Sequence, residues 1–142
     1  MISYQSQVKV DRSPETVFRY LIEPDKQAQW ADLTMRPLSD GPPAQGYRME
    51  ISFGLGPIKA RMGVEYRAFE PGRRLQFGTF SGPIRWEGEY RLEPDGEGTR
   101  LSQRGSLVFT GLWRLVEPLV GSEIKNGEIK ELDKLKAAAE AA

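Results

Sequence analysis

The chain has 142 residues, with 20 Lys and Arg against 20 Asp and Glu, and it contains no His and no Cys. Without an imidazole or a thiol, the sequence excludes Ser-His and Cys-His nucleophile pairs, His-carboxylate iron sites and Cys/His zinc sites. The balanced charge and the lack of a basic block argue against a nucleic-acid partner. We therefore expect neither a metal nor a cofactor.

The length and the hydropathy of the chain predict one globular domain over residues 1–142. A chain of this size can bury roughly 68–70% of its unfolded surface, which is enough for one core. The N-terminus alternates polar and apolar residues, unlike a signal peptide, and no stretch approaches the ~20 apolar residues that span a bilayer. We expect a soluble, cytoplasmic protein without an integral membrane segment or a disulfide scaffold.

The first third of the chain predicts a strand, two short helices and a second strand. Residues 2–10 alternate with a period of two, as a half-buried strand does. Ser13 can cap a helix that Pro14 begins and that ends near residue 22. Residues 23–25 repeat the start signal and lead toward Trp30, so we expect a second short helix before a strand around residues 35–38.

From residue 47 the chain predicts a series of strands separated by turns. The alternating segments are residues 47–53, 58–67, 75–79, 86–92 and 101–109. Gly and Pro clusters between them are typical of turns, including Gly54-Leu55-Gly56-Pro57 and Ser81-Gly82-Pro83. Strands joined by short turns pair antiparallel, because a parallel return needs a crossover of a dozen or more residues. The segments therefore predict one meandering sheet.

The C-terminal part of the chain predicts a long helix. From Gly111 the apolar residues follow a helical spacing, and a helix reaching about residue 140 would be ~45 Å long. Pro118 is expected to interrupt or kink this helix. The apolar patch of Leu112, Trp113, Leu115 and Val116 is expected to pack within the chain, with contact to another subunit or to a membrane surface as the alternatives.

The predicted elements indicate an internal cavity. Six or seven strands at ~4.8 Å spacing make a sheet roughly 30 Å wide, whereas one helix covers only ~10–12 Å. The sheet must curl around the helix, and the short helices must close one end, which leaves a concavity. We expect the opening near the Leu55 and Gly82 loops.

The expected lining of this cavity consists of inward-facing apolar and aromatic side chains with a few polar groups among them. It comprises Trp30, Met49, Ile51, Phe53, Met62, Val64, Tyr66, Phe77, Thr79, Trp86, Tyr90, Gln103, Leu107, Val116, Val120 and Ile124. The alternative is that these rings fill the interior and that each polar group is satisfied by a neighbour or a structural water.

Several short motifs occur in an order that resembles a known family. They are Ser13-Pro14-Glu15-Thr16-Val17-Phe18, Pro24-Asp25 with Trp30, Gly46-Tyr47, Glu70-Pro71-Gly72-Arg73-Arg74-Leu75, Glu93-Pro94 and Gly98-Thr99-Arg100-Leu101, before a C-terminal helix. Over nearly the whole chain this order resembles the polyketide cyclase/dehydrase-like branch of the START-related SRPBCC superfamily.

The resemblance implies an α+β helix-grip fold, also seen in plant pollen allergens. In this fold a curved antiparallel sheet of six to seven strands wraps around a long C-terminal helix, with two short helices after the first strand. Members of the superfamily bind lipids, sterols, polyketides or quinones, and only some of them catalyse a reaction. Some relatives carry a His-rich iron site, which this chain without His cannot form.

A reaction would require a proton acceptor near the reacting carbon. By helical spacing Glu123 falls on the inward face near Val116, where it could act as a general acid or base beside Tyr66 or Tyr90. The alternative is that Pro118 turns Glu123 toward solvent and that both tyrosines are core aromatics. The charged strand residues alternate outward and predict a solvated face: Glu50, Glu65, Glu87 and Glu89 with Arg48, Arg61, Arg67, Arg85 and Arg91.

Three functional hypotheses follow from these features. The first is a carrier or sensor, monomeric or homodimeric, that holds a lipid, polyketide, quinone or aromatic molecule in the cavity. The second is a cofactor-independent cyclase, aromatase or dehydratase that acts on a polyketide-like substrate. The third is a protein-interaction adaptor with a filled core and an exposed apolar patch.

Overall fold

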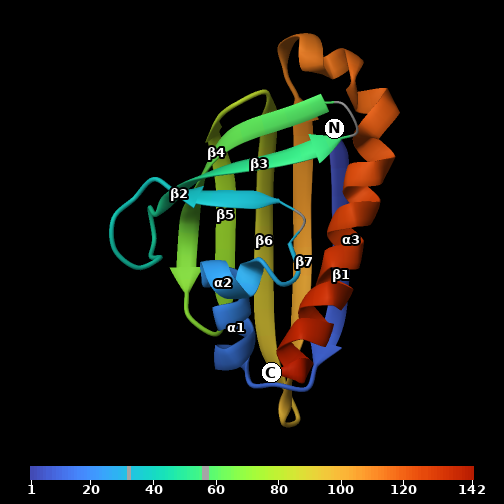
Figure 1. Cartoon of the computed structure of the whole chain (residues 1–142). Helices are drawn as coiled ribbons and strands as arrows, with labels where there is room; N and C mark the ends of the chain where they lie inside the picture. Colours follow the sequence, from blue (N-terminus) through green and yellow to red (C-terminus); the bar gives the residue numbers. More distant parts are fainter. Residues whose placement is uncertain (32, 56–57) are drawn as a thin grey trace.

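The computed structural model describes residues 1–31, 33–55 and 58–142 (Figure 1). The elements are β1 (Ile2–Val10), α1 (Pro14–Ile22), α2 (Pro24–Gln27), β2 (Thr34–Pro37), β3 (Arg48–Leu55), β4 (Ile58–Glu70), β5 (Arg74–Ser81), β6 (Ile84–Asp95), β7 (Gly98–Phe109), the 3-10 helix η1 (Gly111–Leu115) and α3 (Glu117–Ala141). The predicted turn at residues 56–57 lies outside the described residues.

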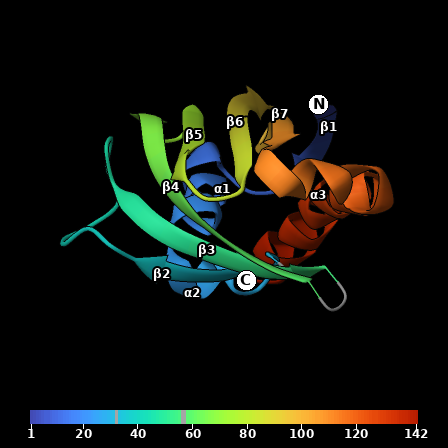
Figure 2. The same ribbon diagram turned by 90° about the horizontal axis from the view of Figure 1, so that it is seen from above.

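One antiparallel sheet of seven strands, in the order β1-β7-β6-β5-β4-β3-β2, forms the body of the described structure. Consecutive strands from β2 to β7 pair as a meander, and β1 joins at the far side by pairing with β7 from Ile2↔Leu107 to Val10↔Thr99. Seen from above, the sheet curves so that β2 and β3 reach toward α3 on its concave side (Figure 2). The expected helix-grip fold of the α+β class is confirmed.

The two short helices form where the start signals predict them. The Ser13 hydroxyl accepts a hydrogen bond from the Thr16 backbone N–H at 3.3 Å, and Pro14 occupies the first turn of α1. Helix α1 buries an apolar face that includes Phe18 and Leu21. After α2, the Trp30 indole donates to the Tyr20 carbonyl at 2.8 Å, which ties the segment after α2 back onto α1.

The C-terminal helix differs from the prediction. We expected a helix from Gly111 with a kink at Pro118, but η1 ends at Leu115 and α3 begins at Glu117, so Pro118 lies in its first turn. Proline is tolerated there because the backbone N–H of that position has no partner within the helix. Helix α3 therefore continues without interruption, and its buried residues form one stripe: Val120, Gly121, Ile124, Glu128, Glu131, Leu132, Leu135 and Ala139.

Helix α3 packs along β1 on the concave side of the sheet (Figures 1 and 2). At its end, Glu140 accepts hydrogen bonds from the Asp11 backbone N–H at 2.8 Å and from the Lys136 ammonium at 2.7 Å. These bonds lower the pKa of the Glu140 carboxyl, with the Lys136 bond as the largest cause. No helix in the described part of the chain is long and apolar enough to cross a membrane.

Candidate functional site

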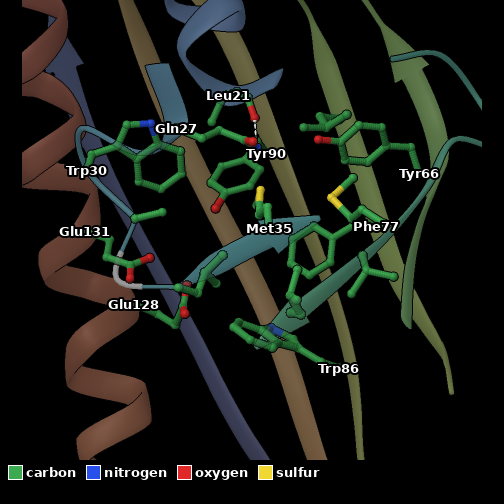
Figure 3. A pocket seen from close by; sticks show the side chains of 16 residues that line it. Leu21, Gln27, Trp30, Met35, Tyr66, Phe77, Trp86, Tyr90, Glu128 and Glu131 are labelled. Carbon is green, nitrogen blue, oxygen red and sulfur yellow. Dashed lines mark hydrogen bonds between the residues drawn. The ribbon is translucent and has the colours of Figure 1, made fainter. Parts of the chain in front are cut away.

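A cavity lies between the concave face of the sheet, α3 and the two short helices (Figure 3). It has a volume of about 60 Å³. Its lining is mostly apolar and aromatic: Leu21, Gln27, Trp30, Ala31, Leu33, Met35, Met49, Ile51, Val64, Tyr66, Leu75, Phe77, Trp86, Tyr90, Glu128 and Glu131. The volume admits a few water molecules and is smaller than the ~300–1,000 Å³ of typical ligand pockets.

Two carboxylates from α3 line this otherwise apolar cavity. Glu128 and Glu131 are only 8% and 7% exposed, and they lie three residues apart, which places them on the same face of the helix. Figure 3 shows both side chains projecting from α3 toward the space around Tyr90 and Met35. Acidic side chains are rarely buried to this extent, so this pair is the most unusual feature of the cavity.

Tyr90 extends from β6 into the same space with its hydroxyl toward the two carboxylates (Figure 3). The residue is 9% exposed. Burial raises the pKa of its phenol well above the usual value, and the negative charge of Glu128 adds to the increase. None of the described residues forms a hydrogen bond with the Tyr90 hydroxyl, in contrast to those of Tyr4 and Tyr66.

Tyr66 and Gln27 form the polar end of the cavity next to α1. The Gln27 amide donates a hydrogen bond to the Leu21 carbonyl, and its side chain also bonds to the Tyr66 hydroxyl. Burial raises the pKa of Tyr66 to about 12, although the bond with Gln27 opposes the increase. Tyr66 therefore keeps its proton at neutral pH and is held in place by a partner inside the protein.

On the other side of the cavity, a buried hydrogen bond fixes the Trp86 ring. The Trp86 indole donates to the Tyr4 hydroxyl at 2.9 Å. Gln103, which we expected in the lining, instead donates to the Ser6 hydroxyl at 3.0 Å and to the backbone carbonyl of Glu128 at 2.8 Å. The Gln103 amide therefore holds α3 at Glu128, whose side chain lines the cavity.

The structure brings part of the predicted lining together around the cavity. The predicted residues that line it are Trp30, Met49, Ile51, Val64, Tyr66, Phe77, Trp86 and Tyr90. The other predicted residues lie outside the lining: Phe53, Met62, Thr79, Gln103, Leu107, Val116, Val120 and Ile124. Among these, Met62 and Leu107 are core residues, Phe53 packs edge-on against Trp86, and Thr79 accepts a hydrogen bond from the Trp86 backbone N–H.

Of the two alternatives for Glu123, a buried carboxylate or a residue turned toward solvent, the second holds, because Glu123 is exposed. The prediction placed it on the inward face of a helix that starts at Gly111, but the phase of α3 is set by its start at Glu117. With that phase Ile124 faces inward, and the positions one and two turns further along this face are Glu128, Glu131 and Leu132. A helical stripe continued from Ile124 would have identified both buried glutamates.

Two further predictions about the surface need correction. The apolar patch packs within the chain only in part: Trp113 and Val116 are partly buried against the core, whereas Leu112 is 83% exposed and Leu115 is 75% exposed. Gly82 does not border the cavity but lines a separate surface hollow with Thr79 and Phe80, while the Leu55 side chain is not described. The half-buried residues of the cavity wall are instead Ala31, Leu33, Met35 and Phe77.

The outer face of the sheet carries the expected charges, with one difference. Glu89 is only 6% exposed, because Arg74, Arg91 and Arg104 surround it. Burial alone would raise its pKa, but the hydrogen bond from Arg91 and the three positive charges together lower it. Among the described residues, no group of three or more His, Cys, Asp and Glu is placed to hold a metal ion.

Solved structures share this fold across nearly their whole length. The protein TTHA0849 from Thermus thermophilus is 19% identical, with a TM-score of 0.81 over 98% of this chain and 97% of that chain. The ZhuI aromatase/cyclase from Streptomyces sp. R1128 is 14% identical, with a TM-score of 0.79 over 97% and 93%. Ara h 8.0201 is 9% identical, with a TM-score of 0.72 over 99% and 98%.

No curated protein sequence matches the chain significantly. A family described as polyketide cyclase / dehydrase and lipid transport does match, over residues 1–140. This match spans the sheet, the short helices and almost all of α3, which together build the cavity. The chain therefore belongs to the polyketide cyclase / dehydrase and lipid transport family of the SRPBCC superfamily.

Proposed function

We propose that this protein binds a small hydrophobic molecule in the cavity between the sheet and α3, as a carrier or sensor. The observation that carries the proposal is a mostly apolar and aromatic lining drawn from the sheet, α3 and the two short helices. Apolar concave sites with a few placed polar groups are the usual form of small-molecule pockets. The family to which the chain belongs includes lipid transport in its description, which supports the same conclusion.

A ligand larger than a few waters requires the cavity to widen, and we infer that the wall that moves most easily is the one to which Ala31, Leu33 and Met35 contribute. Strand β2 has four residues and lies at the edge of the sheet, where it pairs only with β3. Ala31, Leu33 and Met35 are half-buried, so they separate the cavity from solvent with a single layer. Methionine adapts its shape at low energetic cost, so we place the opening beside Met35.

Native mass spectrometry of the purified protein, followed by organic extraction, tests the proposal. We expect a stoichiometric hydrophobic molecule, or uptake of a hydrophobic fluorescent probe where the protein is isolated empty. Met35→Trp should block uptake by filling the opening, whereas the matched variant Leu38→Trp, at an exposed position just beyond β2, should not. An empty protein that also ignores the probe would contradict the proposal and favour the adaptor hypothesis.

A second candidate function is a cofactor-independent cyclase or dehydratase. The observation that favours it is the placement of Glu128 and the Tyr90 hydroxyl in one cavity, since Glu128 can accept a proton and Tyr90 retains one at neutral pH. In an aldol cyclisation the carboxylate removes a proton from the carbon beside one carbonyl. The enolate carbon then bonds to a second carbonyl carbon, and the resulting alkoxide takes a proton from the phenol. Transfer of the carboxyl proton back to the phenolate restores both groups.

Turnover of a β-polyketone analogue separates the two functions. For an enzyme, Glu128→Gln should keep ligand affinity and lose most of the turnover, while Glu123→Gln on the exposed side of the same helix should match the wild type. For a carrier or sensor, the bound analogue should be recovered unchanged from all three proteins.

A further inference from the structure

We propose that the edge strand β1 is a self-association surface, at which two copies of this chain pair their β1 strands antiparallel about a two-fold axis at Gln5. Among the described strands β1 pairs with β7 alone, so it forms one edge of the sheet (Figure 1). An unpaired edge presents backbone N–H and C=O groups to a further strand. Strand β2 lies at the opposite edge, so this pairing leaves free the opening that we place beside Met35.

The pairing of β7 with its two neighbours decides which backbone groups of β1 point outward. Pro94 pairs with Thr99 in the β6–β7 ladder, and this pair is not hydrogen-bonded in both directions because proline has no N–H. The N–H and C=O groups of Thr99 therefore point toward β1, where Thr99 pairs with Val10. Hydrogen-bonded and non-hydrogen-bonded pairs alternate along an antiparallel ladder. The odd-numbered residues from 3 to 9 thus direct their N–H and C=O groups away from β7.

Side chains of α3 bond to this edge only at its two ends. At one end the Lys136 ammonium donates to the Lys9 carbonyl at 2.7 Å, which agrees with an outward direction of the odd-numbered carbonyls. At the other end the N-terminal ammonium of Met1 lies 3.5 Å from the Glu117 carboxylate. Between these ends, the outward backbone groups of residues 3–7 form no hydrogen bond with the described residues. The free stretch of the edge is therefore centred on Gln5.

The free stretch is complementary to itself in the antiparallel direction. With the axis at Gln5, Ser3 pairs with Gln7 of the second copy. Three N–H groups of each copy then meet three C=O groups of the other, which gives six hydrogen bonds. The side chains that meet on the outer face are uncharged, so no like charges lie opposite each other. On the inner face Ile2 meets Val8 of the second copy, and both are half-buried apolar residues.

The opposite edge of the sheet carries protection that β1 lacks. Strand β2 has only four residues and ends in Pro37. Short edge strands and proline are common means by which proteins prevent edge-to-edge association. Strand β1 has nine residues, none of them proline, and its register with β7 contains no bulge. Its one charged side chain is that of Lys9, close to the end that α3 already covers.

Sedimentation velocity of the unmodified protein tests the proposal. Six backbone bonds along a short edge make a weak interface, so we expect monomers at ~5 µM and mostly dimers at ~0.5 mM. Gln5→Pro should remain monomeric throughout, because it removes the N–H groups at the axis and spares the ladder with β7. The matched variant Gln5→Thr loses the same side chain but keeps the N–H, and it should dimerise like the wild type. Circular dichroism verifies that both variants are folded.

A cross-linking test does not depend on the proline variant, and it uses the lack of Cys in the chain. Gln5→Cys places two thiols opposite each other on residues whose Cα atoms are ~5.5 Å apart, within the range of a disulfide. In Lys9→Cys the thiols of the two copies lie eight residues apart along the ladder, or ~26 Å. Oxidised glutathione should therefore link Gln5→Cys at least ~10-fold faster than Lys9→Cys.

The outcomes decide for or against this surface. Monomers at every concentration would overturn the proposal. A dimer that persists in Gln5→Pro, or equal rates of cross-linking in the two thiol variants, would also overturn it and direct attention to the exposed Leu112, Leu115 and Leu119. Loss of the dimer in Gln5→Pro but not in Gln5→Thr, together with selective linkage of Gln5→Cys, would support it.

Discussion

The indole nitrogen of Trp86 lies 2.9 Å from the hydroxyl oxygen of Tyr4, to which it donates a hydrogen bond. Both side chains are buried, and the bond joins β6 to β1 across the intervening strand β7. It therefore holds the Trp86 ring against the cavity while it links the first strand to the centre of the sheet. Burial is the largest cause of the raised pKa of the Tyr4 phenol, and the negative charges of Glu128 and Glu131 raise it further.

Tyr4→Phe should lower the free energy of unfolding by ~1–3 kcal/mol, because it leaves the buried indole N–H of Trp86 without an acceptor. Urea denaturation monitored by circular dichroism measures this change. Tyr90→Phe is the matched control, since it removes a buried hydroxyl without a hydrogen-bond partner among the described residues and should cause no loss of stability. Equal losses in the two variants would show that the Tyr4 to Trp86 bond does not stabilise the fold.

Gly105→Ala should also destabilise the protein, by ~1–3 kcal/mol. Gly105 pairs with Tyr4 across β1 and β7, and a Cβ atom at this position would lie 2.3 Å from the Tyr4 hydroxyl oxygen and 2.4 Å from the ring carbon that carries it. The Tyr4 ring would have to move away from Trp86, which loosens the cavity wall. Thermal denaturation gives the first measure, and a changed near-ultraviolet spectrum of the tryptophans gives the second.

Gly127→Ala should stabilise the protein, in contrast to Gly105→Ala. Gly127 lies within α3, and a Cβ atom there would meet nothing within 4 Å. Alanine should therefore stabilise the helix by ~0.5–1 kcal/mol through the lower entropy of the unfolded chain. A loss of stability in Gly127→Ala would mean that α3 does not have the continuous course described above.

Stability should fall steeply in alkaline solution. Burial raises the pKa of Tyr66 to about 12, and the pKa values of Tyr4 and Tyr90 are raised in the same direction. Tyrosine in an unfolded chain loses its proton near pH 10, so the unfolded state binds fewer protons above that pH and is favoured as the pH rises. The contribution of the protonated Tyr66 to the free energy of unfolding is fully present below about pH 10. It is lost as the pH rises through 12, and the free energy of unfolding then falls by up to roughly 3 kcal/mol.

Urea midpoints measured at about pH 8 and about pH 11 check this expectation. Tyr66→Phe removes one of the titrating groups and should make the decline with pH shallower, although it also removes the hydrogen bond with Gln27 and lowers stability at neutral pH. An identical decline in Tyr66→Phe and in the wild type would exclude Tyr66 as a cause.

Glu89→Gln should destabilise the sheet by ~1–3 kcal/mol, because Arg74, Arg91 and Arg104 would lose the carboxylate that lies among them. The lowered pKa of Glu89 means that its contribution is present at neutral pH and is lost on acidification through that pKa. Glu87→Gln on the same face of β6 is the control, with an expected change within ~1 kcal/mol for its exposed pair with Arg67. Urea denaturation measures both changes. Equal losses of stability in the two variants would contradict the conclusion that the buried Glu89 contributes more to stability than the exposed Glu87.

The sheet and the short helices were predictable because each has a local signal. Alternation with a period of two identifies the strands, and Ser13 followed by Pro14 identifies the start of α1. The start of α3 was not predicted, because a proline in the first turn of a helix and a proline that kinks a longer helix give the same local pattern. Only the packing of α3 on β1 distinguishes the two.

The aromatic part of the site was predictable from strand alternation, whereas its carboxylates were not. Tyr66, Phe77 and Tyr90 lie at positions whose neighbours alternate outward, so their direction follows from the strands alone. Glu128 and Glu131 were missed because the inward stripe of a helix is traced through apolar residues, and an acidic residue in that stripe is read as a surface position. Departures from the apolar pattern of this kind are expected at functional sites.

The pairing of β1 with β7 affects when the chain can fold during its synthesis. Residue 2 pairs with residue 107, and α3, which covers β1, follows later still. During synthesis β1 therefore leaves the ribosome long before either partner exists, and the apolar side chains of Tyr4 and Val10 have nothing to pack against. Closure over such a separation is slow. A nascent chain stalled before residue 98 should thus remain open to chaperones and proteases, and it gains resistance only when β7 has emerged.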